Sequence, residues 1–177
     1  YYLAGLVGYG AKALKAAGMQ VELLSGDAPA PVEDLAQRLG IPLWQAGVLP
    51  AEKAARVAAL SAEGRKVLMV GDGLNDGPAL AAGHVSMAPG SASDAGQNAA
   101  DAIFLGDSLA PVATAVRAAR ATQKVVRQNF AMAIGYNLIA VPLAIMGLVT
   151  PLIAALAMSG SSLIVVANAL RLRSAAQ

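Results

Sequence analysis

Two aspartates, Asp72 and Asp76, lie in the segment 70–80, which reads VGDGLNDGPAL. The apolar run 66–70 before them is typical of a buried strand, and the residues after them begin a helical pattern. A strand–loop–helix that presents two carboxylates at the C-terminal end of the strand is a natural site for magnesium beside a phosphate. The alternative is an ordinary turn, because Gly, Asp and Asn are common in turns of every kind.

Short apolar runs alternate with helical patterns along the first part of the chain, which predicts an α/β domain with a parallel sheet covered by helices. In such sheets the ligand binds beyond the C-terminal ends of the strands. A second strand also ends in an acidic loop, Ser25-Gly26-Asp27, so we expect the two loops to converge on one site. The expected strands are 21–24, 41–44, 66–70, 84–87 and 102–105, and the expected helices are 12–17, 32–39, 51–63, 78–82 and 109–127.

The composition indicates membrane segments beside the α/β domain. Hydrophobic residues make up 56% of the chain and charged residues 14%, against about 25% charged in a typical soluble domain. A net charge of +2 without a basic stripe argues against nucleic acid as a partner. The absence of cysteine excludes a disulfide framework within these residues. The opening residues show no signal peptide and are more typical of a cut end than of a natural start.

No Lys, Arg, Asp or Glu occurs between Gln128 and Leu170. Residues 130–148 and 152–170 are each long enough to span a hydrocarbon core of about 30 Å. Basic residues flank the outer ends of this hairpin, so the positive-inside rule places both ends and the α/β domain in the cytoplasm. The alternative is a buried helical hairpin in a soluble protein.

Three motifs in this order resemble the C-terminal part of the heavy-metal P-type ATPases. The hinge motif Gly-Asp-Gly-x-Asn-Asp-x-Pro-Ala-Leu matches residues 71–80, with Gly77 where the family usually has Ala. The Thr-Gly-Asp element appears as residues 25–27, and the lysine element as Leu-Pro-Ala-Glu-Lys at 49–53. The resemblance covers nearly the whole chain and implies a haloacid dehalogenase-type, Rossmann-like phosphorylation domain.

The resemblance also implies a catalytic cycle through an aspartyl phosphate, with ATP and Mg²⁺ as cofactors. Asp72 would bind magnesium directly, with Asp76 as its partner in that site. Asn75 would donate a hydrogen bond to the phosphoryl oxygens, and Lys53 would place a positive charge on them. For Lys53 the alternative is a solvated lysine on an amphipathic helix.

The same resemblance assigns the first acidic loop to phosphate binding. The Ser25 hydroxyl and the Gly26 amide would donate to the phosphate. Asp27 would orient the loop or take part in movement of the nucleotide-binding domain.

The membrane part resembles the copper(I) subgroup of the same family. Its penultimate helix carries Tyr-Asn, then four residues, then Pro, which matches Tyr136, Asn137 and Pro142. Its last helix carries Met-x-x-Ser-Ser and then Asn, which matches Met158, Ser161-Ser162 and Asn168. Residues 148–173 also resemble the branch that delivers copper for haem–copper oxidase assembly.

A soft, uncharged membrane site fits Cu(I). Met158 is the best candidate ligand, because a thioether sulfur is soft, and the resemblance adds Tyr136, Asn137, Ser161 and Ser162. Zinc pumps of the family place charged residues in these helices, and this chain has none there. The alternative for Ser and Asn is hydrogen bonding between neighbouring helices. We also expect Pro142 to break the helical hydrogen bonding near Asn137.

The expected organisation has five parts: the end of a cytoplasmic phosphorylation domain (1–108), a connecting helix (109–129), two transmembrane helices (130–149 and 152–170) and a cytoplasmic tail (171–177). The phosphorylated Asp-Lys-Thr-Gly element, the nucleotide-binding and actuator domains and the Cys-Pro-Cys helix do not occur in these residues.

We therefore expect the C-terminal part of a Cu(I) export pump, inactive alone, in a bacterial inner membrane. Its expected partners are the lipid bilayer, the N-terminal part of the same pump and a copper chaperone. The alternatives are a pump of this type for Zn(II) or Ag(I), and a catalytically silent, membrane-anchored fragment with a binding or regulatory role.

Overall fold

The computed structural model of the chain describes residues 3–73, 75–106 and 108–174. The chain forms two compact units, residues 1–113 and residues 114–177. The first unit contains the α/β elements, and the second consists of helices. Each unit is described by itself below.

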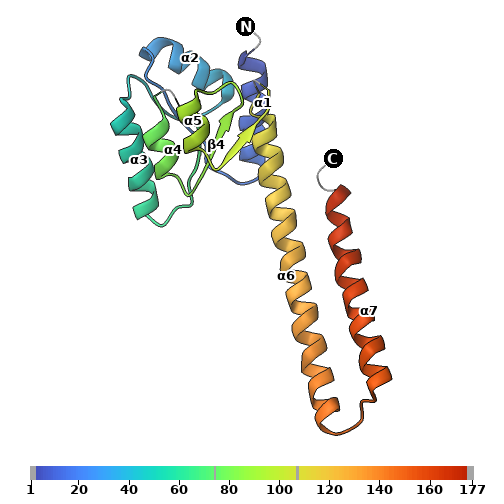
Figure 1. Cartoon of the computed structure of the whole chain (residues 1–177). Coiled ribbons are helices and arrows are strands. Elements are labelled where there is room, and N and C mark those ends of the chain that lie inside the picture. Colours follow the sequence, from blue (N-terminus) through green and yellow to red (C-terminus); the bar gives the residue numbers. More distant parts are fainter. Residues whose placement is uncertain (1–2, 74, 107, 175–177) are drawn as a thin grey trace. The chain divides into compact units, whose positions relative to one another are not determined.

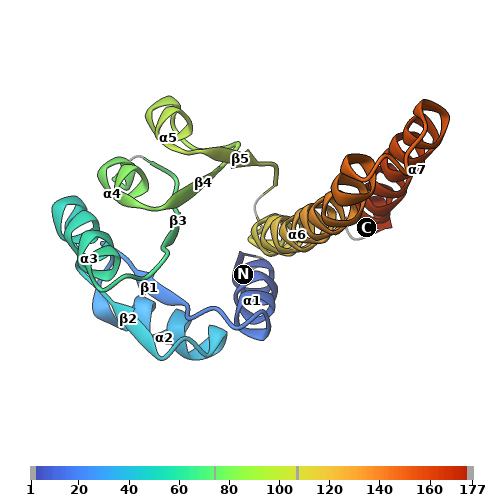
Figure 2. The same cartoon turned by 90° about the horizontal axis from the view of Figure 1, so that it is seen from below.

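The first unit alternates helices and short strands, as the sequence predicts (Figures 1 and 2). The expected elements are present, most with ends shifted by up to a few residues, but α1 begins nine residues before the expected start at Lys12. Its elements in chain order are α1 (Leu3–Ala16), β1 (Glu22–Leu24), α2 (Pro29–Leu39), β2 (Leu43–Gln45), α3 (Pro50–Ala62), β3 (Leu68–Val70), α4 (Gly77–Ala82), β4 (Val85–Pro89), α5 (Asp94–Ala99) and β5 (Ala102–Phe104).

The strands form two parallel sheets rather than one. β1 pairs with β2, with Glu22 opposite Leu43, and the other sheet has the order β3-β4-β5. β4 lies at the centre of that second sheet, and its residues Ser86, Met87 and Ala88 are buried. The predicted α/β class with parallel pairing is therefore confirmed, with a break between the strands that carry the two acidic loops.

One helix, α5, is not predicted by the sequence, because its six residues show no apolar periodicity. It begins with a capping contact instead, because the Ser93 hydroxyl accepts a hydrogen bond from the Gly96 amide at 3.2 Å. Gly96 itself is buried. This short helix supports the second acidic loop, as described below.

The second unit is a helical hairpin. α6 (Ala110–Ile145) and α7 (Pro151–Leu170) run antiparallel, and η1 (Arg171–Ser174) follows (Figure 1). The Asn168 amide joins the two helices, since it donates to Asn129 Oδ1 at 2.9 Å and to Gln128 Oε1 at 3.3 Å. Both helices are long and apolar enough to cross a membrane.

α6 is one continuous helix of 36 residues, about 54 Å long. It runs through the expected connecting helix (109–129) and most of the first expected span (130–149) without interruption. α6 continues through Pro142 to Ile145. Pro142 has no amide hydrogen, so it cannot donate to the Leu138 carbonyl, while the Met146 amide bonds to the Pro142 carbonyl at 3.0 Å. About nine turns of α6, residues 110–141, precede Pro142, and the loss of one hydrogen bond does not end the helix there.

Candidate phosphate site and membrane site

The loop from Gly71 to Asp76 joins β3 to α4 and rests on the start of α5. Gly73 has φ +80°, and a Cβ added there would lie 1.9 Å from the Gly96 Cα. Only glycine accepts both that backbone angle and that close approach. The Ser93 amide also donates to the Asp72 carbonyl at 3.3 Å. The loop is therefore held by backbone contacts, with the Asp72 side chain exposed.

Asp76 turns back onto the same loop. A Cβ on Gly71 would lie 2.6 Å from Asp76 Oδ2, so this carboxylate lies directly against the Gly71 backbone. Its other oxygen, Oδ1, accepts a hydrogen bond from the Lys53 Nζ at 2.7 Å. The two side chains are only 9% and 15% exposed. A buried ion pair of this kind needs good geometry to offset its desolvation, and Lys53 is not the solvated surface lysine of the alternative reading.

Lys53 is positioned by the start of α3. Pro50 occupies the first turn, where its missing amide hydrogen is not needed. The Glu52 carboxylate accepts from the Leu49 amide at 2.8 Å, and the Lys53 amide donates to the Leu49 carbonyl at 3.0 Å. The Leu-Pro-Ala-Glu-Lys motif is thus a helix start that fixes its lysine on the first turn.

The first acidic loop is held by the segment that leads into α3. The Ser25 hydroxyl donates to Asp27 Oδ2 at 2.9 Å, and the Asp27 amide donates to the Ser25 hydroxyl at 3.2 Å. On the backbone, the Val48 amide donates to the Ser25 carbonyl and the Gly47 amide donates to the Asp27 carbonyl. The loop is a compact turn in which Gly26 and Asp27 are exposed and Ser25 is half-buried.

One ion pair near the site was not expected from the sequence. The Arg56 guanidinium on α3 donates from Nε and Nη2 to the two oxygens of Glu22 on β1, at 2.9 and 3.0 Å. This two-point contact with a carboxylate raises the pKa of Arg56 above its ordinary value. The two residues are 34 positions apart, and no sequence pattern pairs them.

The structure brings together some of the predicted site residues. Lys53 and Asp76, which come from separate motifs, are in direct contact. Asp72 and Asn75 are exposed on the same loop as Asp76. The loop of Ser25 belongs to the β1–β2 sheet and the loop of Asp76 to the sheet of β3, so the two loops end different sheets. Residue 74, within the hinge motif, lies outside the described residues.

The oxygen-rich loop suits magnesium. Mg²⁺ prefers one or two carboxylates together with phosphate oxygens and water. Within the described part of the chain, no group of three or more His, Cys, Asp or Glu is placed to enclose a metal ion. Asp72 is exposed at the loop surface, and one oxygen of Asp76 is already bound to Lys53. Two carboxylates would fill only part of the coordination shell of the cation and leave its other positions to phosphate and water oxygens. This donor set fits a cation that binds a phosphate at the same time.

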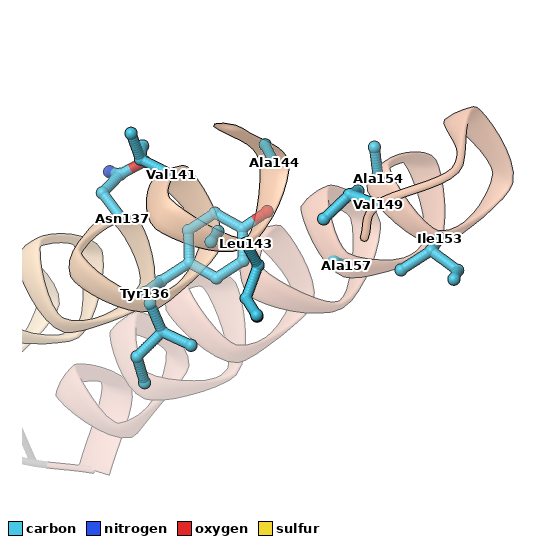
Figure 3. A pocket seen from close by; sticks show the side chains of 11 residues that line it. Tyr136, Asn137, Val141, Leu143, Ala144, Val149, Ile153, Ala154 and Ala157 are labelled. Atoms are coloured by element: carbon cyan, nitrogen blue, oxygen red, sulfur yellow. The ribbon is translucent and has the colours of Figure 1, made fainter. Parts of the chain in front are cut away.

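The predicted membrane residues divide into two groups. Tyr136 and Asn137 line a cavity of about 410 Å³ between α6 and α7, whose wall on α7 includes Ile153 and Ala157 (Figure 3). The Asn137 amide donates to the Ala133 carbonyl at 2.9 Å, one turn earlier in its own helix. Most of the other lining residues are aliphatic, so the cavity is largely apolar.

Met158 and the two serines are not among the residues that line this cavity. Met158 is 67% exposed, and the Ser162 hydroxyl donates to the Met158 carbonyl at 3.0 Å. Ser161 is half-buried. The hairpin by itself does not gather the five residues into one site, and their role as a copper site stays a prediction.

Comparison with known proteins first defines the class. Residues 9–84 match a family model described as haloacid dehalogenase-like hydrolase. This match begins within α1, ends just before β4, and includes all three motifs and the Lys53–Asp76 pair. The predicted haloacid dehalogenase-type fold is confirmed.

Similar relatives define the family more narrowly than the family model does. The chain is 57% identical over 162 residues to the nitrogen fixation protein FixI of Bradyrhizobium diazoefficiens, covering 92% of this chain and 22% of that protein. It is 42% identical to a copper-exporting P-type ATPase of Staphylococcus aureus, covering 92% of this chain and 20% of that protein. The crystal structure of a zinc-transporting PIB-type ATPase in the E2·Pi state matches with a TM-score of 0.85 and 34% identity, over 93% of this chain and 27% of that one.

The chain therefore belongs to the heavy-metal P-type ATPases, as its motifs indicate. It spans about a fifth of the length of the curated relatives it matches. The similarity extends across both the α/β unit and the helical hairpin.

Proposed function

We propose that the chain supplies part of the phosphate site and two membrane helices of an ATP-driven Cu(I) export pump. The pump works through an aspartyl phosphate whose nucleophile lies outside these residues. The observation that carries this proposal is the buried contact of 2.7 Å between Lys53 and Asp76, at the C-terminal end of β3. It brings two distant motifs together where α/β sheets bind their ligands.

The break between the two sheets indicates where the strand that carries the nucleophilic aspartate would lie. β1 pairs with β2 on one edge and β3 pairs with β4, and no strand in the described part of the chain pairs with their other edges. All residues of β1 and β3 are half-buried, and an unpaired strand edge leaves backbone N–H and C=O groups without partners. We infer that a parallel strand from the N-terminal part of the pump fills this position. Its C-terminal end would then emerge between the loops of Ser25 and Asp72, with the nucleophilic aspartate on it.

The chain's own residues would act on that aspartate by positioning and charge. Asp72 and Asp76 would hold Mg²⁺, which offsets the negative charge of the phosphoryl group when bound. The Lys53 ammonium and Asn75 would contact phosphoryl oxygens from one side. The Ser25 hydroxyl and the Gly26 amide would donate from the other. Phosphoryl transfer depends mainly on such positioning and electrostatic stabilisation.

The proposed cargo is Cu(I). The two membrane helices carry no acidic or basic side chain between Gln128 and Leu170, and a neutral site with a soft thioether suits a monovalent soft ion. Cu(I) would meet Met158, Tyr136, Asn137 and the two serines once the pump's other helices surround the hairpin. We place the α/β unit in the cytoplasm of a bacterium, where a copper chaperone would deliver the ion.

Zinc is the alternative cargo, because the solved structure that matches over 93% of this chain is a zinc-transporting ATPase. The test is phosphorylation of the full-length protein by labelled ATP in the presence of one metal at a time. We expect Cu(I) or Ag(I) to stimulate labelling and Zn(II) to have no effect. Stimulation by Zn(II) alone would show that the transported metal is zinc and not copper.

A catalytically silent fragment is the remaining alternative. Sequencing the DNA upstream of Tyr1 distinguishes it. We expect an open reading frame that contains an Asp-Lys-Thr-Gly motif and a Cys-Pro-Cys helix. A start codon immediately before Tyr1 would contradict the proposal.

A further inference from the structure

Helix α3 holds the two halves of the proposed phosphate site by two ion pairs. Lys53 reaches Asp76 in the loop after β3, and Arg56 reaches Glu22 on β1. The two basic residues are three positions apart, so they lie on neighbouring positions of one helix face. β1 and β3 belong to separate sheets, and the side chains of α3 contact both halves.

The geometry of the Arg56–Glu22 pair restricts the orientation of α3. Nε and Nη2 contact Oε1 and Oε2 in parallel, at 2.9 and 3.0 Å. A two-point contact of this kind restricts rotation of the helix about its own axis in a way that a single ammonium–carboxylate contact does not. The Glu22 side chain is only 16% exposed and that of Arg56 is 33% exposed, so both ends of the contact are largely fixed by their surroundings.

Each residue of the Arg56–Glu22 pair lies three positions in sequence from a proposed site residue. Glu22 is the first residue of β1, and the strand leads directly into Ser25. Arg56 follows Lys53 by about one helical turn. A shift of α3 against β1 would therefore move the Lys53 ammonium relative to the Ser25 loop, across the place where the phosphate is proposed to bind.

We propose that Glu22 and Arg56 are positioning residues of the phosphate site: their contact sets the orientation of α3 and thereby keeps the Lys53 ammonium at phosphate distance from the Ser25 loop. This inference rests on the proposed function. Neither residue belongs to the motifs that define the site, and neither contacts the phosphate itself.

The test uses the full-length protein and its labelling by inorganic [³²P]phosphate with Mg²⁺ in the absence of ATP. We expect Arg56→Gln to raise the half-saturating phosphate concentration roughly threefold to tenfold, the range typical of residues that act through another residue. The half-saturating ATP concentration should stay unchanged, because the nucleotide domain lies outside this chain. Arg56→Lys, which keeps the charge but loses the two-point contact, should give an intermediate value.

The matched control is Arg38→Gln. Arg38 forms an exposed pair with Asp34 within α2, at 3.1 Å and with side chains 49% and 65% exposed, and that pair touches no part of the site. Its removal should leave the half-saturating phosphate concentration at the wild-type value. A change as large as that of Arg56→Gln would show a general effect of removing an arginine and would overturn the inference.

A second comparison separates positioning from general loosening of the fold. In a Lys53→Ala background, Arg56→Gln should add no further loss of phosphate affinity, because the side chain that it positions is gone. An equal further loss in that background, or a wild-type phosphate dependence in Arg56→Gln, would overturn the proposal. If Arg56→Gln does not fold, the nearly isosteric Glu22→Gln is measured in its place.

The outcomes also distinguish this inference from the proposed function. If the wild-type protein takes no label from phosphate or from ATP, the proposed function fails. If the wild type is labelled and Arg56→Gln behaves identically to it, only the positioning role fails.

Discussion

Gly73→Ala should destabilise the first unit strongly, although it adds a single methyl group. Gly73 has φ +80°, a conformation that costs a residue with a Cβ about 1–2 kcal/mol. The new Cβ would also lie 1.9 Å from the Gly96 Cα and 2.7 Å from the Gly96 nitrogen. Both are backbone atoms and cannot rotate away, so the loop has to move off α5.

That movement would stretch the hydrogen bond from the Ser93 amide to the Asp72 carbonyl, which contributes about 0.5–1.5 kcal/mol. Together with the backbone cost, we expect a loss of about 1.5–3.5 kcal/mol in the free energy of unfolding. Gly96→Ala separates the two causes. Its Cβ would meet the Asp72 carbonyl oxygen at 2.5 Å, but its φ is an ordinary one, so it should show the steric part alone, about 1–3 kcal/mol.

The control is Gly77→Ala, in the same motif. A Cβ there meets no atom within 4 Å, and Gly77 is the first residue of α4. We expect it to be neutral or to stabilise by about 0.4–1 kcal/mol. The assay is urea unfolding of the chain in detergent, followed by the fluorescence of Trp44, the single tryptophan, which lies on β2 in the first unit. Equal stability of Gly73→Ala and Gly77→Ala would refute the reasoning.

Three further predictions concern other contacts. Lys53→Met should lower the free energy of unfolding by about 3–5 kcal/mol, because it leaves Asp76 buried without its partner. In the Trp44 assay the double variant Lys53→Met/Asp76→Leu should recover most of this loss. Equal stability of the single and double variants would contradict the prediction. Asn168→Ala removes both hydrogen bonds between α7 and α6 and should weaken the hairpin by about 0.6–1.7 kcal/mol, measured as a lower unfolding force for the hairpin pulled from a bilayer; an unchanged force would count against it. The pKa of Arg56 is raised, so its guanidinium stays charged at every pH below the ordinary arginine value and loses its charge only as the pH rises through the raised value. The ratio of half-saturating phosphate between Arg56→Gln and wild type should therefore be constant between about pH 6 and pH 9, and a ratio that changes with pH would show that another group is involved.

The motifs predict the parts of the site that are local in sequence. The order of the Ser-Gly-Asp, Leu-Pro-Ala-Glu-Lys and hinge motifs indicates the class, and the alternation of apolar and helical segments indicates the parallel sheet. Lys53 meets Asp76 because each lies on an element whose ends are fixed by local rules: Pro50 with Glu52 at the start of α3, and the glycines of the loop after β3.

Other features depend on contacts that no local pattern carries. α5 has only six residues and no apolar stripe. It is held by the close contact of its Gly96 backbone with the backbone of Gly73. The Arg56–Glu22 pair joins residues 34 positions apart. α6 continues through Pro142 because a helix of this length tolerates one missing hydrogen bond. The break between β1 and β3 has no local signal in the sequence either, and we propose that a strand from another part of the pump pairs there.

Labelling of the full-length protein by [γ-³²P]ATP, with Asp72→Ala compared against wild type, tests the central claim most directly. The account predicts label that is stimulated by Cu(I), released by hydroxylamine as an acyl phosphate is, and absent or without turnover in Asp72→Ala. Full turnover in Asp72→Ala, or label that resists hydroxylamine in the wild-type protein, would contradict it.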